Sequence, residues 1–198
     1  WYWYSGVKIM EEALERGFLR APNRKRLRFA LMWANHHWAD YFPAPFEGAW
    51  NSWLPMRHSP RDLDAVIDYC VEHYFRQPNY WRLTGELFFS VFQPDLLVEQ
   101  LGGGEKTKRH LQRIDRTLHA RGLQSMHWNA MTKDPARVAG LAAAGFASTT
   151  SYNVIVNEKP RHPSNLIQQY EDIMEAHRNL WRAMSAAPRP HMPVVTMG

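Results

Sequence analysis

Apolar runs of strand length alternate with helix-spaced segments along this chain, and this alternation limits the possible folds more than any other feature of the sequence. The runs lack polar alternation, as expected of strands that are buried on both faces. They lie at 1–4, 29–33, 86–92, 125–128, 146–150 and 193–198. The segments between them carry apolar residues at helical spacing, in 7–16, 59–74, 94–122, after 135 and in 164–184. Because no hairpin signal separates the runs, the pattern predicts parallel strands joined by helices.

Two α/β architectures fit such a pattern, an open doubly wound sheet and a TIM-type (β/α)8 barrel. No Gly-rich dinucleotide loop follows the first strand, and polar residues follow nearly every strand, so the sequence favours the barrel. A complete barrel has eight strands in about 250 residues. This chain of 198 residues supplies six strands. We therefore expect a single partial barrel domain over 1–198, with strands two to seven, truncated at both ends.

Local signals support the helix assignments. Ser59 and Pro60, followed by Asp62, are typical of a capped helix start, and Asp134-Pro135 begins another helix. Gly102-Gly-Gly104 lacks the preceding strand and the following Lys-Ser/Thr of a phosphate loop, so we interpret it as a hinge between two helices. The single Cys70 falls on the apolar stripe of a helix, which indicates a small core residue and no disulfide framework.

Charge and hydropathy limit the classes of partner. The formal net charge is +5 and the pI is near 9.5, but the basic residues are scattered and no stripe combines them with exposed aromatics. We therefore expect no nucleic-acid partner. No apolar stretch approaches the roughly 20 residues that span a bilayer, so no membrane partner is expected. The chain begins with Trp1 and shows no signal peptide; the compartment stays open, an exported bacterial protein being one option, as does the oligomeric state.

The stretch from Arg28 to Asp40 changes abruptly from apolar to polar at Asn35. In parallel α/β folds, binding sites lie at the carboxyl ends of the strands. Residues at such ends here are amides, imidazoles and aromatics, which suit a polyhydroxylated ligand because rings stack on sugar faces and amides bond hydroxyls. The candidate substrate-binding residues for an oligosaccharide or polysaccharide are Tyr4, Trp33, Asn35, His36, His37, Trp38, Gln93, His127, Asn129 and Tyr152. Six of them should converge on one rim: Asn35, His36, Gln93, His127, Asn129 and Tyr152. The long aromatic loop 34–58 should add Trp50 and Trp53 to a cleft with Trp33 and Trp38.

Catalytic groups are harder to find. Glycoside hydrolysis in its usual form needs two carboxyl groups, and only Asp40 lies close behind a strand end, because Glu86 begins its strand. No metal and no cofactor are expected, since adjacent His36 and His37 point to opposite sides of an extended chain and no His-x-His spacing occurs. A metal-dependent hydrolase built on His36, His127 and Asp40 stays open as an alternative.

Several of these segments resemble one family. The run Phe-Ala-Leu-Met-Trp-Ala-Asn-His-His-Trp at 29–38 is similar to the Trp-Ala-Asn-x-x-Trp strand of glycoside hydrolase family 99-like proteins, also called glycosyltransferase WbsX-like. The segment 77–92 resembles that family's entry into its next strand, and 1–4 and 194–198 resemble its second and seventh strands. The chain departs from the family pattern at Leu87, where Pro is common, and at His36-His37, where an acidic or amide residue is frequent.

The resemblance implies a (β/α)8 barrel that acts on complex glycans and is related to endo-acting mannosidases. It also implies that the catalytic Glu pair lies on the last strand, after Gly198, so that no residue of this chain takes that role. We therefore expect a fragment of a glycoside hydrolase that is catalytically silent on its own. A non-catalytic glycan-binding module is the alternative.

Overall fold

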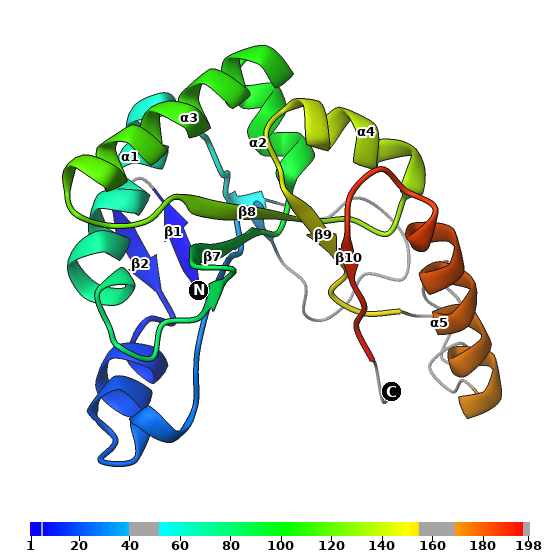
Figure 1. Cartoon of the computed structure of the whole chain (residues 1–198), viewed down its shortest axis with the longest axis horizontal. Coiled ribbons are helices and arrows are strands. Elements are labelled where there is room, and N and C mark those ends of the chain that lie inside the picture. The colour runs from blue at the N-terminus through cyan, green and yellow to red at the C-terminus, as the bar shows by residue number, and fades with distance from the viewer. Residues whose placement is uncertain (5, 40–51, 155–168, 196–198) are drawn as a thin grey trace.

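The computed structural model describes residues 1–4, 6–39, 52–154 and 169–195, which form a mixed α/β fold around a mostly parallel sheet (Figure 1). Five strands pair in parallel and lie side by side in chain order: β3 (Leu31–Trp33), β7 (Glu86–Val91), β8 (Met126–Met131), β9 (Ser148–Thr150) and β10 (His191–Met192). Strands β3 and β10 are the two ends of this path. The described strands therefore form an open sheet and no closed barrel.

From residue 60 onward, the helices follow the strands in the order that the sequence predicted. They are α1 (Pro60–Cys70), the π-helical turn η4 (Val71–Phe75), α2 (Pro94–Gln100), α3 (Gly104–Ala120), α4 (Pro135–Ala143) and α5 (Tyr170–Ser185). Figure 1 shows α1 to α4 in an arc over one side of the sheet, with α5 at the far end of the arc. In the described part of the chain, no helix combines the length and the apolar character that crossing a bilayer requires.

The helix starts confirm the local signals. Ser59 Oγ accepts a hydrogen bond from the Asp62 amide, and Asp62 Oδ2 accepts one from the Ser59 amide, each at 3.1 Å. Asp134 caps α4 by accepting from the Ala136 amide. The hinge between α2 and α3 is also confirmed, because Gly103 has a φ of 101°, which favours glycine. Cys70 is fully buried in α1, as predicted.

The prediction that the chain contains no hairpin was wrong. Strand β1 (Tyr2–Tyr4) pairs antiparallel with β2 (Val7–Ile9) in a separate two-stranded sheet, where a helix had been expected over 7–16. Gly6 has a φ of 94°, and the pairing of Tyr4 with Val7 leaves a two-residue connection, so a tight turn replaces the helix start. Helical structure begins only with the π-helical turn η1 (Ala13–Gly17).

Two further antiparallel pairs occur. Strand β6 (Arg82–Leu83) pairs with the start of β7, and β4 (Trp38–Ala39) pairs with β5 (Ser52–Leu54). The region 34–58, predicted as one loop, therefore contains a short β-ribbon. The last strand, β10, precedes the predicted segment 193–198, whose final residues lie outside the described part of the chain. Ser164, the predicted start of the long helix, also lies outside it.

Strand β8 extends beyond its predicted end at Trp128. Its alternating side chains divide between two environments. Trp128 and Ala130 belong to the hydrophobic core with Phe89 and Val91 of β7. His127 and Asn129 face the other way, in register with Phe88 and Ser90. The polar residues of this strand therefore mark one face of the sheet and not the end of a strand.

Candidate functional site

A pocket of about 620 Å³ lies at the carboxyl ends of β3 and β7. Its lining is mostly aromatic and apolar, with one imidazole, one amide and two phenols. The lining residues are Trp1, Tyr2, Met10, Met32, Ala34, His36, Phe92, Gln93 and Tyr152. Such a surface, with few polar groups at fixed places, is typical of small-molecule sites. The pocket therefore brings together three of the predicted rim residues, His36, Gln93 and Tyr152.

Ring contacts run around this pocket. The His36 ring lies 5.4 Å from Tyr2 and 5.2 Å from Phe92, and Phe92 meets the ring of Tyr152 edge-on at 5.5 Å. Trp38 contacts Tyr2 edge-on at 4.9 Å, behind the lining. These contacts hold aromatic rings from β1, the end of β3 and the end of β7 in one continuous surface.

Two phenol groups give the pocket its adjustable hydrogen-bonding capacity. Tyr152 is 62 % exposed. Burial raises the pKa of Tyr2, and the neighbouring Tyr152 raises it further, which places the two hydroxyl groups within electrostatic range of each other. The raised pKa keeps the Tyr2 hydroxyl protonated at neutral pH, and a phenol hydroxyl both donates and accepts a hydrogen bond.

Asn35, which the sequence placed among the rim residues, lies behind the pocket and is fully buried. Its Oδ1 accepts a hydrogen bond from the Gln93 amide at 2.6 Å, and its Nδ2 donates to the Gln93 carbonyl at 2.9 Å. The second Nδ2 proton faces His58 Nε2 at 3.2 Å. Asn35 therefore fixes the backbone of a lining residue, and its own amide is fully engaged.

His58 extends this chain of hydrogen bonds to α2. Its ring Nδ1 lies 2.7 Å from Oε1 of Gln100, an atom that can only accept, so Nδ1 carries the proton and Nε2 accepts from Asn35. Burial lowers the pKa of His58 to about 4, which keeps the ring neutral in this tautomer. The end of α2, the segment before α1 and the ends of β3 and β7 are thus joined through side chains.

Two other predicted residues brace the chain around the pocket. The Tyr4 hydroxyl donates to the His36 carbonyl at 3.0 Å, and the Met56 amide donates to Nδ1 of His37 at 2.9 Å. His36 Nδ1 lies 2.7 Å from the His37 carbonyl and donates to it. His36 and His37 therefore have different surroundings, in keeping with adjacent residues on an extended chain.

The predicted tryptophans divide between the interior and the surface. Trp33 is 1 % exposed and packs in the hydrophobic core, where its ring meets His58 edge-on at 5.1 Å. Trp53 on β5 is 66 % exposed. Trp50 and Asp40 lie outside the described residues.

His127 and Asn129 are not at the pocket, because both lie inside β8 and not at its end. Asn129 Nδ2 donates to Ser148 Oγ and its Oδ1 accepts from Ser90 Oγ, each at 2.8 Å. Ser148 in turn lies 2.8 Å from His127 Nε2, and His127 Nδ1 lies 3.3 Å from Glu86. Ser90, Asn129 and Ser148 are almost completely buried, and this network provides hydrogen-bond partners for their polar side chains inside the fold.

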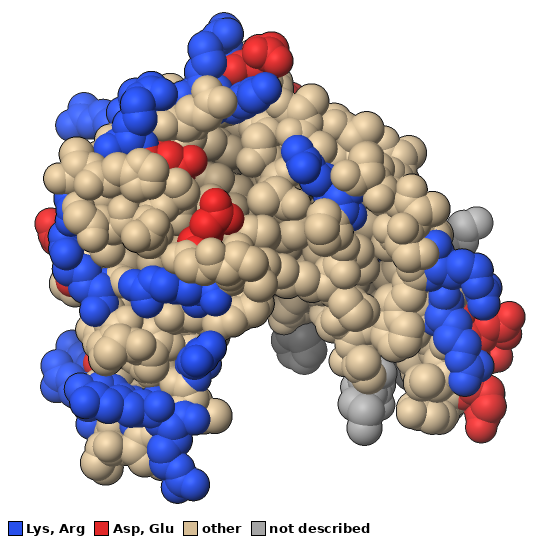
Figure 2. Space-filling model, viewed as in Figure 1, with Lys and Arg blue, Asp and Glu red and all other residues tan. Residues whose placement is uncertain are grey.

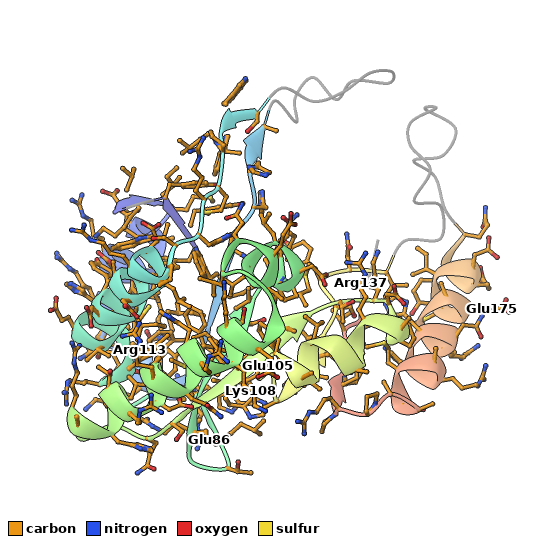
Figure 3. All side chains as sticks on the ribbon, turned by 90° about the horizontal axis from the view of Figure 1, so that it is seen from above. Glu86, Glu105, Lys108, Arg113, Arg137 and Glu175 are labelled. Atoms are coloured by element: carbon orange, nitrogen blue, oxygen red, sulfur yellow. The ribbon has the colours of Figure 1, made fainter. Side chains whose placement is uncertain are left out.

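The geometry also separates the proposed metal ligands. His127 is the second residue of β8, three residues before Ala130, which is level with Val91 and Trp33. His36 follows Trp33, so His36 and His127 lie about 10 Å or more apart along the strands. In Figure 3, Glu86 lies at the bottom of the view, and the β4–β5 ribbon lies at the top. Within the described ranges, no group of three or more His, Cys, Asp or Glu side chains is placed to hold a metal ion.

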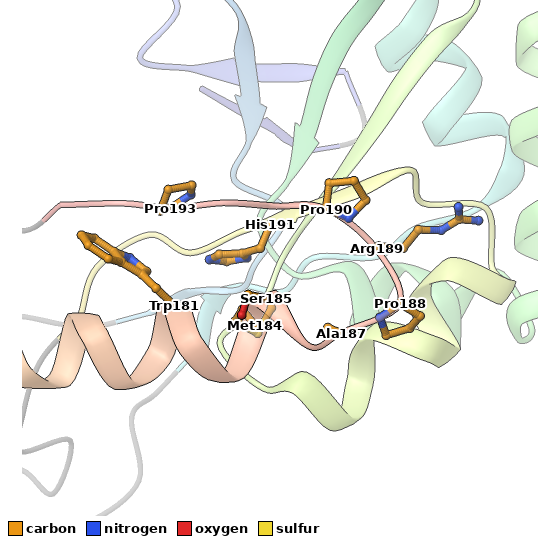
Figure 4. A pocket seen from close by; sticks show the side chains of 9 residues that line it. All are labelled: Trp181, Met184, Ser185, Ala187, Pro188, Arg189, Pro190, His191 and Pro193. Atoms are coloured by element: carbon orange, nitrogen blue, oxygen red, sulfur yellow. The ribbon is translucent and has the colours of Figure 1, made fainter.

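A second cavity, of about 610 Å³, lies between α5 and β10 (Figure 4). Its lining includes three prolines and the side chains of Trp181 and His191. Trp181 Nε1 and His191 Nε2 are buried and have no hydrogen-bond partner in the described structure. Because both atoms are closed off from solvent, they offer no hydrogen bond to a ligand in the cavity.

Sequence reasoning missed six pocket residues, and two of them, Tyr2 and Phe92, belong to the ring of aromatic contacts. Tyr2 shares a strand face with Tyr4, and the two rings stack at 6.2 Å, so the period of two along the strand pointed to it. Phe92 directly precedes Gln93 at the end of β7. Its apolar character assigned it to the buried strand.

Comparison with known proteins gives one match. A family model described as Glycosyltransferase WbsX matches residues 1–194, nearly the whole chain. No curated protein and no solved structure matches the chain.

Proposed function

Because the chain belongs to the glycosyltransferase WbsX family and is thus carbohydrate-active, we propose that the pocket at the ends of β3 and β7 binds a sugar unit of a complex glycan. The observation that carries this proposal is the ring of aromatic side chains from Tyr2 through His36 and Phe92 to Tyr152. The apolar face of a pyranose stacks on such rings, and its hydroxyl groups need neutral donors and acceptors.

The polar groups of the pocket suit a neutral sugar. Among the described lining residues there is no carboxylate, Lys or Arg, and the raised pKa of Tyr2 keeps its phenol protonated at neutral pH. Gln93 adds an amide at a position that Asn35 fixes through the backbone. Hydroxyl, imidazole and amide groups together both donate to and accept from a polyol.

The proposed reaction is glycoside hydrolysis of the endo-mannosidase type, and the proposed architecture is an arc of a (β/α)8 barrel. Strand order that follows the chain, helices over one side of the sheet and a pocket at the carboxyl ends of the strands support the barrel. Hydrolysis requires carboxyl groups that the described lining does not supply. Asp40 stays the one candidate within the chain, and the pocket would serve as a sugar-binding subsite.

Glycan titration tests the binding proposal. Isothermal calorimetry of the protein with a panel of α-mannan oligosaccharides should show saturable binding. Tyr152→Ala removes an exposed ring from the pocket and should weaken the affinity about fivefold, equivalent to a stacking contribution of about 1 kcal/mol. Tyr170→Ala, which removes a similarly exposed ring from the start of α5, is the matched control and should leave the affinity unchanged.

A reducing-end assay on the same panel then separates hydrolysis from binding alone. Binding without release of reducing ends would favour a non-catalytic glycan-binding module. Equal loss of affinity in Tyr152→Ala and Tyr170→Ala would place the sugar outside this pocket.

A further inference from the structure

The excess positive charge of the chain lies in one short segment. The chain has 24 Lys and Arg against 19 Asp and Glu. Residues 18–28 contain five of the basic residues and no acidic residue, so without this segment the two signs are equal in number. The five are Arg20, Arg24, Lys25, Arg26 and Arg28. We call the segment 18–28 the basic lobe.

The basic lobe presents these charges to solvent. Its backbone forms two 3-10 turns, η2 (Phe18–Arg20) and η3 (Arg24–Arg26), and four of the five basic residues are exposed, Arg24 being half-buried. None of the five pairs with a carboxylate of the described residues. Figure 2 shows Lys and Arg side chains gathered over this part of the molecule, the projecting region at the lower left of Figure 1. A concentrated, uncompensated charge of one sign is typical of a surface for an anionic partner.

The contacts that fix the basic lobe to the rest of the fold do not involve its charged side chains. Asn79 Nδ2 donates to the carbonyl groups of Arg24 and Leu27, at 3.0 and 2.9 Å. The ring of Phe18 packs on Phe29 at 5.5 Å. These contacts use the backbone and the aromatic residues of the lobe and none of its charged groups.

One exposed apolar side chain favours an anionic membrane over a nucleic acid as the partner of the basic lobe. Leu27 is 66 % exposed and lies between Arg26 and Arg28. Basic residues that flank an exposed apolar residue match the interface of an anionic bilayer, where cations meet headgroups and the apolar group enters the acyl boundary. A single-stranded nucleic acid would need exposed aromatic rings for stacking, and both rings at the lobe, Phe18 and Phe29, pack on each other.

We propose that the basic lobe binds the surface of an anionic phospholipid membrane, with Lys25, Arg26 and Arg28 at the headgroups and Leu27 at the acyl boundary. The lobe leads into the amino end of β3, through the pairing of Phe29 with Tyr80, whereas the sugar pocket lies at the carboxyl ends of β3 and β7. The two surfaces are therefore separate, and this proposal does not depend on glycan binding. It replaces the expectation that the chain has no membrane partner.

Vesicle co-sedimentation tests the proposal. The protein should sediment with phosphatidylcholine vesicles that contain phosphatidylglycerol and not with phosphatidylcholine alone, and high salt should release it. The triple variant Lys25→Gln, Arg26→Gln, Arg28→Gln should bind about tenfold more weakly or worse. The variant Leu27→Ser should also bind more weakly, while keeping the salt dependence.

The matched control is Lys106→Gln, Lys108→Gln, Arg109→Gln, which removes the same charge from exposed residues of α3. The control should keep the vesicle affinity. Equal weakening by both triple variants would assign the effect to net charge and overturn the proposal. Binding to heparin or single-stranded DNA without binding to the anionic vesicles would overturn it in favour of another polyanion.

Discussion

The side-chain amide of Asn35 pairs with both backbone hydrogen-bonding groups of Gln93, which comes just after β7 and lines the pocket at the ends of β3 and β7. Paired in this way, the amide acts as a clasp between the ends of β3 and β7. The clasp continues through His58 to Gln100 at the end of α2. The polar residue that the sequence assigned to ligand contact therefore holds the wall of the pocket.

Substitution of Asn35 should destabilise the protein strongly. Asn35→Ala removes, from a fully buried position, the side-chain amide that pairs with the Gln93 backbone amide and carbonyl and with His58 Nε2. We expect the free energy of unfolding to fall by about 3 kcal/mol, measured by urea denaturation. Asn23→Ala, at an exposed position of the basic lobe, should change it by less than about 0.5 kcal/mol. A similarly small effect in Asn35→Ala would show that the clasp does not stabilise the fold.

The sequence predicted the parts of the fold that depend on local pattern. The strands at Leu31–Trp33 and Glu86–Val91 and the cap at Ser59 follow from apolar runs and turn chemistry. The β1–β2 hairpin was missed because Val7 to Arg16 also has helical spacing, and the turn at Gly6 decided the outcome.

The site was predictable only in part, because burial is a property of the tertiary structure. His36 and Tyr152 line the pocket, and their role in binding stays a prediction. Polar residues after an apolar run predict the end of a strand, but His127 and Asn129 lie inside β8. Their partners Ser90 and Ser148 come from neighbouring strands and are distant in the sequence, so the buried polar layer had no local signal.

Stability should decrease in weakly acidic solution because of His58. Burial lowers the pKa of this ring to about 4 in the folded protein, against 6.5 ordinarily. As the pH falls, the unfolded chain binds a proton first, so stabilisation is fully present above about pH 6.5 and is lost as the pH falls toward 4. The total is on the order of 3 kcal/mol.

The comparison that isolates His58 is the pH dependence of urea unfolding in the parent protein and in His58→Gln. Burial also lowers the pKa of His110 and of His191, so the parent slope has several contributions. His58→Gln should be less stable at neutral pH and should show a flatter slope between pH 6.5 and 4. Identical slopes would mean that His58 titrates normally in the folded state.

The Cys70 thiol should be inert until the protein unfolds. It is fully buried in α1, so a reagent cannot reach it. Burial also raises the pKa of the thiol, so the reactive thiolate does not form. We expect no reaction with a thiol-specific chromogenic disulfide under native conditions and one thiol per chain in denaturant. Rapid native labelling would contradict the packing of α1 against the sheet.

Trp38 should support sugar binding through Tyr2. The two rings meet edge-on at 4.9 Å, and Tyr2 lines the pocket while Trp38 lies behind it. In Trp38→Ala, Tyr2 loses the ring that holds its plane, and the glycan affinity measured by calorimetry should fall about fivefold, equivalent to about 1 kcal/mol. Trp38→Phe keeps an aromatic ring and should restore most of the affinity. Trp53→Ala removes an exposed indole from the neighbouring strand β5 and tests whether that ring also contacts the glycan. Unchanged affinity in Trp38→Ala would assign this tryptophan to packing alone, because the loss of a ring that orients Tyr2 should weaken the binding of any sugar that stacks on Tyr2.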